Sequence, residues 1–250
     1  MKLFDLTGKA AMVTGTSGGI GQTLAVGLAE AGASVVCVTA TSSDETVEAI
    51  RRLGGKAEQI SADLGKAEIL EDVVRQAMGF FGRIDILVNN AGIIRRAPAA
   101  QHNWQDWRDV LDVNLSSVFY LCQLVGRHML ERGSGKIINI ASMLSFQGGI
   151  NVPGYTASKH GVAGITKALA NEWAGKGIQV NAIAPGYIRT RNTAPLIADE
   201  NRYRSITERI PAGRWGEPED LKGAVIFLAS AASDYVNGHV LCVDGGWMAR

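Results

Sequence analysis

The chain has 250 residues, of which 46% are hydrophobic and 20% are charged, and its formal net charge is +1. This length fits one large α/β domain, and the balanced charge gives no electrostatic basis for binding nucleic acid or a membrane surface. No apolar run approaches the roughly 20 residues that cross a bilayer. Three widely spaced cysteines match neither a metal site nor a disulfide framework. We therefore expect buried free thiols in a cytoplasmic protein, with no metal site.

The first elements are a short apolar run at residues 10–14, a glycine-rich turn and a helical pattern at residues 20–31. Glycines let the backbone approach a pyrophosphate, and the start of a helix presents unpaired N–H groups to it. The alternative is a tight turn that only connects two packed elements. The order strand, turn, helix favours a dinucleotide site. The expected cofactor contacts in the turn are Gly15, Thr16, Ser17, Gly19, Ile20 and Gly21.

The end of the second strand, at residues 34–39, bears on the choice of cofactor. An acidic residue here binds the ribose hydroxyls of NAD, whereas the 2′-phosphate of NADP needs a cation. Thr39 and Ala40 occupy this place, and Gly18 in the turn is not basic. The missing cation argues against NADP(H) more strongly than the missing acid argues against NAD(H). The sequence therefore favours NAD(H), with NADP(H) as an open alternative. We expect Thr39 and Ala40 to contact the cofactor.

A helical pattern at residues 44–53, a third strand at 56–61 and a helix at 66–81 come next. Asp63 and Leu64 follow the third strand, where they are expected to contact the adenine. Asp63 fits a bond to the adenine amino group and fits a helix N-cap equally well.

A buried strand begins at Asp85 and ends in polar amides and a glycine at Asn90, Ala91 and Gly92. In an open parallel sheet, ligands bind beyond the carboxyl ends of the strands, so these three residues are expected to face a cofactor. Arg95 and Arg96 follow. They are either solvated loop charges or a cation for an anionic substrate, since arginine suits carboxylates.

Residues 104–132 form one long helical pattern with Asn114 in an apolar setting. A buried amide needs partners. Asn114 either bonds back within the helix or interrupts the helical ladder and anchors a water near Lys159.

A fifth strand at residues 136–141 ends at Ser142, and the helix expected at 153–174 carries Tyr155 and Lys159 on one face, one turn apart. A tyrosine four residues before a lysine is also a common surface pair. As an acid–base pair, the phenol has an ordinary pKa of about 10, which a nearby cation lowers. Bringing it to about 7 takes ~3 units, so a second cation is expected besides Lys159.

The sixth strand, at residues 178–184, leads to Pro185 and Gly186. The polar segment at about 187–211 is expected to form a mobile cover over the site. A helix at 218–230 and a last strand at 239–243 complete the alternation.

The alternation predicts an α/β fold: a single Rossmann-type, doubly wound parallel sheet of about seven strands, with helices on both faces. No linker or repeat divides the chain. We therefore expect one dinucleotide-binding catalytic domain over residues 1–250.

Six motifs occur in the order typical of the classical short-chain dehydrogenase/reductase family, which the whole chain resembles: Thr14-Gly15-x-x-x-Gly19-x-Gly21, Asn89-Asn90-Ala91-Gly92, Asn114, Ser142, Tyr155-x-x-x-Lys159 and Pro185-Gly186. The resemblance implies that Tyr155 is the acid–base group and that Ser142 orients the substrate oxygen. It implies that Lys159 lowers the pKa of Tyr155, that Asn114 holds a relay water, and that the oxidised nicotinamide is the second cation. It also implies a homotetramer and cofactor contacts by Tyr155, Lys159, Pro185, Gly186, Ile188 and Thr190.

Three further stretches, at 138–149, 210–216 and 233–247, are similar to the 2-deoxy-D-gluconate 3-dehydrogenase (2-keto-3-deoxy-D-gluconate dehydrogenase) branch of this family, which acts in pectin and uronate breakdown. The implied substrate is an anionic deoxy sugar acid. The expected substrate contacts are Ser142, Gln147, Tyr155, Arg95, Arg96, Arg191 and Asn192.

Two other functions compete with this interpretation. An NADPH-dependent 3-oxoacyl carrier-protein reductase would share every catalytic residue, but the uncharged stretch at 39–42 argues against it. A non-catalytic dinucleotide-binding regulator would share the fold without the chemistry.

Overall fold

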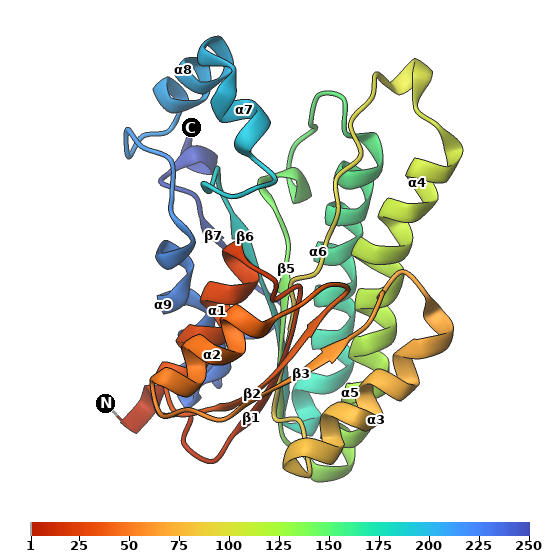
Figure 1. Ribbon diagram of the computed structural model, residues 1–250, viewed down its shortest axis with the longest axis vertical. Helices are drawn as coiled ribbons and strands as arrows, with labels where there is room; N and C mark the ends of the chain where they lie inside the picture. The colour runs from red at the N-terminus through yellow and green to blue at the C-terminus, as the bar shows by residue number, and fades with distance from the viewer. Residues whose placement is uncertain (1) are drawn as a thin grey trace.

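The centre of the molecule is a seven-stranded parallel sheet in the order β3-β2-β1-β4-β5-β6-β7 (Figure 1). The computed structural model describes residues 2–250. The predicted doubly wound sheet is confirmed. Its strands are β1 Ala10–Thr14, β2 Ser34–Thr39, β3 Ala57–Ser61, β4 Ile86–Asn89, β5 Gly135–Ile140, β6 Ile178–Pro185 and β7 Val240–Val243.

The central strands are short apolar runs because both of their faces are covered. Every residue of β1 and of β4 is buried. Successive side chains of a strand point to opposite faces. Met12 therefore belongs to the hydrophobic cluster on one face, whereas Ala11 and Val13 belong to the cluster on the other.

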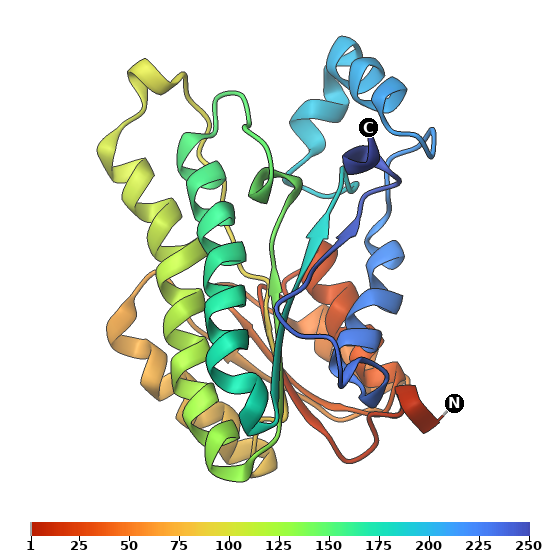
Figure 2. The same cartoon turned by 180° about the vertical axis from the view of Figure 1, so that it is seen from behind.

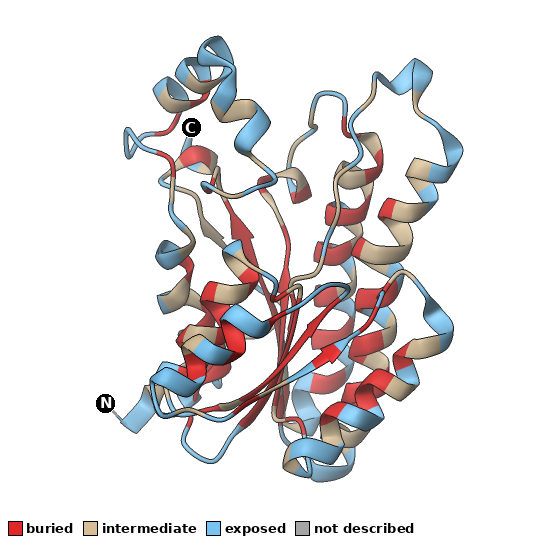
Figure 3. Ribbon diagram, in the orientation of Figure 1, coloured by how far each residue is buried: buried red, intermediate tan, exposed pale blue. Residues whose placement is uncertain are grey.

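The helices form a layer on each face of the sheet (Figures 1 and 2). One layer consists of α1 Gly19–Glu30, α2 Asp44–Arg52 and α9 Lys222–Ala229. The other is built on α3 Leu70–Phe81, α5 Ser117–Arg132 and α6 Pro153–Trp173, with α4 Trp104–Leu111 packed on α6. Figure 3 shows the buried residues of both layers turned toward the sheet. No helix within residues 2–250 combines the length and the apolar character needed to cross a bilayer.

The long helix predicted at residues 104–132 is interrupted. Between α4 and α5 the chain makes a π-helical turn, Asp112–Ser116, with Asn114 at its centre. Such a turn inserts one residue into the α-helical ladder and is frequent at functional sites. Of the two alternatives that the sequence leaves open for Asn114, the structure therefore has the interrupted helical ladder.

The place where the chain reverses its winding lies between β1 and β4, which are neighbours in the sheet. The connections after these two strands leave in opposite directions, so a crevice opens at their carboxyl ends. The segment expected as a cover contains α7 Ala194–Ala198 and α8 Glu200–Arg209. Figure 1 places these helices and the C-terminus together beyond the carboxyl ends of β6 and β7.

Candidate active site

The glycine turn after β1 has the shape that a bound pyrophosphate requires. Gly15 has a φ of +73°, and a Cβ there would lie 2.8 Å from Cα of Ala91. A Cβ on Gly21 would overlap the carbonyl oxygen of Gly15. Because α1 begins at Gly19, its unpaired N–H groups point toward the same crevice. The turn therefore fits the pyrophosphate of a dinucleotide cofactor.

The end of β4 is tied directly to this turn. Nδ2 of Asn90 donates to the carbonyl oxygens of Thr14 and Gly15, at 2.9 and 3.1 Å. Oγ1 of Thr14 accepts from the backbone N–H groups of Asn90 and Ala91, both at 3.0 Å. These bonds hold the two strand ends together on either side of the crevice, so the Asn90 side chain is occupied in shaping it.

Asn114 links the loop after β4 to α6. Its side chain is fully buried, with Oδ1 accepting from N of Ile93 at 2.8 Å and Nδ2 donating to O of Ile93 at 3.0 Å. Nδ2 also reaches Oγ of Ser158, at 3.3 Å, and Ser158 donates to the carbonyl of Tyr155, at 2.8 Å. The amide thus has partners outside its own helix, and the predicted water near Lys159 stays a prediction.

Ser142, Tyr155 and Lys159 are brought together by bonds between the β5 turn and α6. Ser145, which the sequence analysis overlooked, accepts from N of Ser142 at 3.3 Å and donates to O of Lys159 at 2.7 Å. Nζ of Lys159 donates to O of Ile140 at 2.6 Å and lies 5.5 Å from the centre of the Tyr155 ring. The structure forms a capping box here with a serine at the third position, where the usual sequence signature has Glu or Gln, so no standard signal marked Ser145.

The electrostatics of the pair differ from the expectation. Burial raises the pKa of Tyr155, while the hydrogen-bonding Ser142 side chain and the positive charge of Arg96 lower it in part. Burial also lowers the pKa of Lys159 to about 8. Arg96 rather than Lys159 is the cation that lowers the pKa of Tyr155 in this structure, and the predicted effect of Lys159 stays a prediction. The need for a further positive charge is correspondingly greater.

The two neighbouring arginines point to different places. Arg95 forms ion pairs with Asp106 and Asp109 of α4, at 3.3 and 3.8 Å. Arg96 instead donates to the carbonyl of Asn192 in the cover, at 3.0 Å, and its charge acts on Tyr155. The structure thus pairs Arg96 with the predicted Asn192, lets the charge of Arg96 act on Tyr155, and turns Arg95 toward α4.

Other predicted substrate residues lie at the edge of the cover. Arg191 is exposed. Oε1 of Gln147, in the loop after Ser142, lies 3.5 Å from Nη2 of Arg209. No sequence motif marks Arg209, because its partners lie far away along the chain.

The stem of the cover runs from the sheet to the glycine turn. Pro185 ends β6, and the backbone of Gly186 passes so close to Asp244 that a Cβ would lie 2.6 Å from its Cα. Ile188 is buried and forms an isolated bridge with Gly216. Thr190 lies beside Gly19, whose Cβ would come 3.6 Å from Cγ2 of Thr190. The stem therefore connects β6 with the start of α1.

Some of the residues expected around the adenosine are buried, and others are exposed to solvent. Thr16 is buried and its hydroxyl pairs with Ser43 at 2.7 Å. Ser17 and Ala40 are exposed, whereas Thr39 is buried at the end of β2. Asp63 accepts from N of Gly65 at 3.1 Å, and Leu64 belongs to the hydrophobic core.

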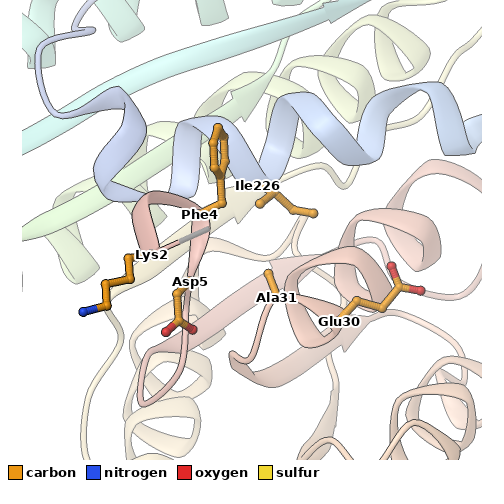
Figure 4. A pocket seen from close by; sticks show the side chains of 6 residues that line it. All are labelled: Lys2, Phe4, Asp5, Glu30, Ala31 and Ile226. Atoms are coloured by element: carbon orange, nitrogen blue, oxygen red, sulfur yellow. The ribbon is translucent and has the colours of Figure 1, made fainter.

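Two hollows are also present in the molecule. One lies between the ends of the cover and β7, lined in part by Tyr187, Arg214 and Asp244. The other, drawn in Figure 4, is lined by Lys2, Phe4, Asp5, Glu30, Ala31 and Ile226. Because Glu30 ends α1, this second hollow lies at the opposite end of α1 from the glycine turn and takes no part in the site.

Known proteins resemble this chain over nearly its full length. Residues 15–248 match the family model described as enoyl-(acyl carrier protein) reductase. The chain is 53% identical to 2-dehydro-3-deoxy-D-gluconate 5-dehydrogenase of Escherichia coli (strain K12), over 100% of this chain and 99% of that protein. It is 57% identical to the Bacillus subtilis (strain 168) protein of the same name, over 99% of this chain and 97% of that one.

A crystal structure of an Agrobacterium tumefaciens protein with bound NADP is 55% identical, with a TM-score of 0.95 and coverage of 100% of both chains. The NADP in this relative does not support the predicted preference for NAD(H). A nicotinamide cofactor is nevertheless common to both expectations. Fold, motif order and full-length similarity agree, and the chain belongs to the short-chain dehydrogenase/reductase family, as an NAD(P)-dependent oxidoreductase acting on CH–OH groups.

Proposed function

We propose that the protein interconverts a secondary alcohol and a ketone at C5 of a deoxy sugar acid of the 2-keto-3-deoxy-D-gluconate type. The observation that carries this proposal is the meeting of Ser142, Tyr155 and Lys159 beside the guanidinium of Arg96. The first three groups handle a carbinol proton, and the fourth lowers the pKa of the phenol and adds positive charge that attracts an anionic substrate. The position C5 follows the names of the Escherichia coli and Bacillus subtilis relatives.

In the oxidative direction, the Tyr155 phenolate takes the hydroxyl proton of the substrate. Oγ of Ser142 accepts from N of Leu144 at 3.1 Å, and its one hydrogen, which bonds to the Tyr155 phenol, turns to the substrate oxygen when substrate binds. Lys159 uses one of its three N–H donors on O of Ile140, which leaves two for the cofactor ribose. The nicotinamide, when bound, accepts the hydride and supplies the positive charge that favours the phenolate.

The rest of the substrate is proposed to lie between the cover and the loop after Ser142. Arg96, Arg191 and Asn192 face it from one side and Gln147 from the other, with Arg95 held back by its two aspartates. Residues 187–211 are proposed to move as the substrate enters. Limited proteolysis with and without cofactor and sugar acid tests this movement.

For the cofactor, we propose that the site accepts both NAD(H) and NADP(H). Neither a carboxylate nor an arginine stands at residues 39–42, where one or the other would enforce selection. Neutral hydroxyls in this stretch, such as those of the exposed Thr41 and Ser42, can pair with a ribose hydroxyl or with a phosphate.

The experiment that tests the function is a substrate panel. Purified protein is assayed by cofactor absorbance with 2-keto-3-deoxy-D-gluconate, 2-deoxy-D-gluconate, D-gluconate and neutral alcohols, with both cofactors. We expect turnover of the deoxy sugar acids above all. Tyr155→Phe should reduce kcat by at least about 100-fold while cofactor affinity stays within several-fold, because only the proton path is lost.

Two outcomes would contradict the proposal. The matching family model is described by an acyl-carrier-protein substrate, so 3-oxoacyl thioesters with NADPH belong in the panel. Turnover of thioesters alone would establish the reductase instead. Tight cofactor binding without turnover of any substrate would indicate a dinucleotide-binding regulator.

We also propose that each chain is one catalytic domain and that the protein is a cytoplasmic homotetramer. The exposed side chains of Trp104 on α4 and Phe119 on α5 support a subunit contact on this layer. Light scattering of the purified protein tests the assembly, and a dimer or monomer would refute it.

A further inference from the structure

Arg209, the last residue of α8, is where three distant segments of the chain meet. Its guanidinium carbon lies 3.9 Å from the centre of the Trp247 ring, in the C-terminal segment. Its Nη2 lies 3.5 Å from Oε1 of Gln147, in the loop that follows Ser142. One cation thus spans the space between the cover, the C-terminus and the catalytic loop.

The partners of Arg209 differ from those of two nearby arginines. Arg189 pairs with Glu217 at 3.2 Å, and Arg214 pairs with Asp220 at 2.7 Å. Within residues 2–250, no carboxylate forms an ion pair with Arg209, whose nearest polar partner across the cover is the neutral amide of Gln147. A guanidinium presents N–H groups in a planar fork that matches the two oxygens of a carboxylate. Arg209 therefore retains the capacity to bind an anion.

Trp247 holds this guanidinium in place without using its donors. Stacking engages the face of the cation, so the in-plane N–H groups stay available. The indole is itself fixed. It is buried, and it packs edge-on against Tyr187 with 4.8 Å between the ring centres. The next residue is also held, because Asp244 accepts from N of Met248 at 2.9 Å. A cation ordered in advance loses less conformational entropy when a ligand binds.

The length of the substrate gives Arg209 a role distinct from that of Arg96. The charge of Arg96 acts on Tyr155, so Arg96 lies at the reacting end of the site. If C5 reacts, the carboxyl carbon is four carbon–carbon bonds away, about 5 Å in an extended chain. The anion therefore needs a cation away from Tyr155, and Gln147, Arg209's partner, lies in the loop that leads away from Ser142.

We propose that Arg209 binds the carboxylate of the sugar acid, replacing its long contact with Gln147, and that Trp247 positions it. Gln147 is then released to bind a substrate hydroxyl. This inference rests on the proposed function and extends it by assigning the group that selects acids over neutral sugars.

The test compares Arg209→Ala and Arg209→Lys with Arg204→Ala, a change of an exposed arginine on the same helix. Each variant is assayed with 2-keto-3-deoxy-D-gluconate and with its neutral methyl ester. Arg209→Ala should raise KM for the acid about 10- to 100-fold, with kcat within about threefold, because a charge-assisted pair is lost. KM for the ester should stay within about twofold, Arg209→Lys should recover part of the loss, and Arg204→Ala should match the parent.

The outcomes separate the inference from the function. Equal increases in KM for acid and ester, or an unchanged KM for the acid, would overturn the role of Arg209 while leaving the function in place. A parent enzyme that turns over no sugar acid would overturn both. Thermal unfolding and cofactor titration of each variant identify a fold defect. If Arg209→Ala has such a defect, Arg209→Lys is compared with Arg209→Gln, a neutral side chain of similar length. An equal KM for the acid in these two variants would count against the proposal.

Discussion

At the scale of single residues, the chemistry depends on the balance of burial and charge around one phenol. Burial raises the pKa of Tyr155, and Ser142 and Arg96 are the groups of this chain that lower it. Arg95 and Arg96 are adjacent in the sequence yet have different partners, because Arg95 pairs with two aspartates of α4. Which of two neighbouring arginines acts on the phenol is thus decided by what lies opposite each of them.

Removing the charge of Arg96 should shift the pH dependence of oxidation upward. The cation favours the phenolate, so its loss raises the pKa of Tyr155, and oxidation needs the phenolate. The rising limb of kcat/KM against pH should therefore move to higher pH in Arg96→Ala and less so in Arg96→Lys. Arg95→Ala is the matched control and should leave the limb in place. Identical profiles for both alanine variants would contradict the role of Arg96.

At the scale of elements, the site depends on three joints between neighbouring elements rather than on any one of them. Asn90 joins the end of β4 to the glycine turn, Asn114 joins the β4 loop to α6, and Ser145 joins the β5 turn to α6. The π-helical turn is what directs the Asn114 amide out of its own helix and toward Ile93. Each joint satisfies buried polar groups, so breaking one leaves donors or acceptors unpaired.

Asn114→Ala should lower both stability and turnover. The change removes the side-chain partners of the Ile93 backbone, which should reduce the free energy of unfolding by about 1–3 kcal/mol, as measured by denaturant titration. The loop after β4 loses its anchor to α6, so kcat should fall as well. Asn103→Ala removes the N-cap of α4 and should lower stability by about 1 kcal/mol without affecting kcat. Equal kcat values in the two variants would show that Asn114 only stabilises the fold.

At the scale of the whole molecule, the sheet order creates the cofactor crevice. Hydrophobic clusters cover both faces of the sheet, and the chain reverses its winding between β1 and β4. A dinucleotide bound in this crevice would lie across both halves of the sheet. Its binding therefore stabilises the folded molecule as a unit.

Both cofactors should raise the melting temperature, by about 5–10 °C at 100 times the dissociation constant. Thr39→Asp should abolish the effect of NADP while preserving that of NAD, because a carboxylate at the end of β2 repels the 2′-phosphate. Ala40→Arg should favour NADP for the opposite reason. Differential scanning fluorimetry at matched concentrations measures both shifts. An unchanged ratio in both variants would mean that the adenosine ribose lies elsewhere.

The amino-acid sequence by itself determined the sheet and its winding, and it predicted the reacting groups. These features depend on local patterns: apolar runs of strand length, glycines that only a close backbone approach requires, and a tyrosine and lysine spaced by one helical turn. The same locality explains the failures. Local pattern could not decide whether Asn114 bonds within its helix or interrupts it, and the absence of a charge at residues 39–42 was a poor guide to the cofactor.

Only the tertiary structure decided how charge and desolvation are distributed around the site. Burial of Tyr155 and Lys159 depends on the packing of α6 against the sheet and α4, which no local spacing encodes. The pairing of Arg95 with α4 and the stacking of Arg209 on Trp247 join residues far apart in sequence. Electrostatic effects act through space and grow as water is excluded, so they become defined only when the fold has brought the groups together.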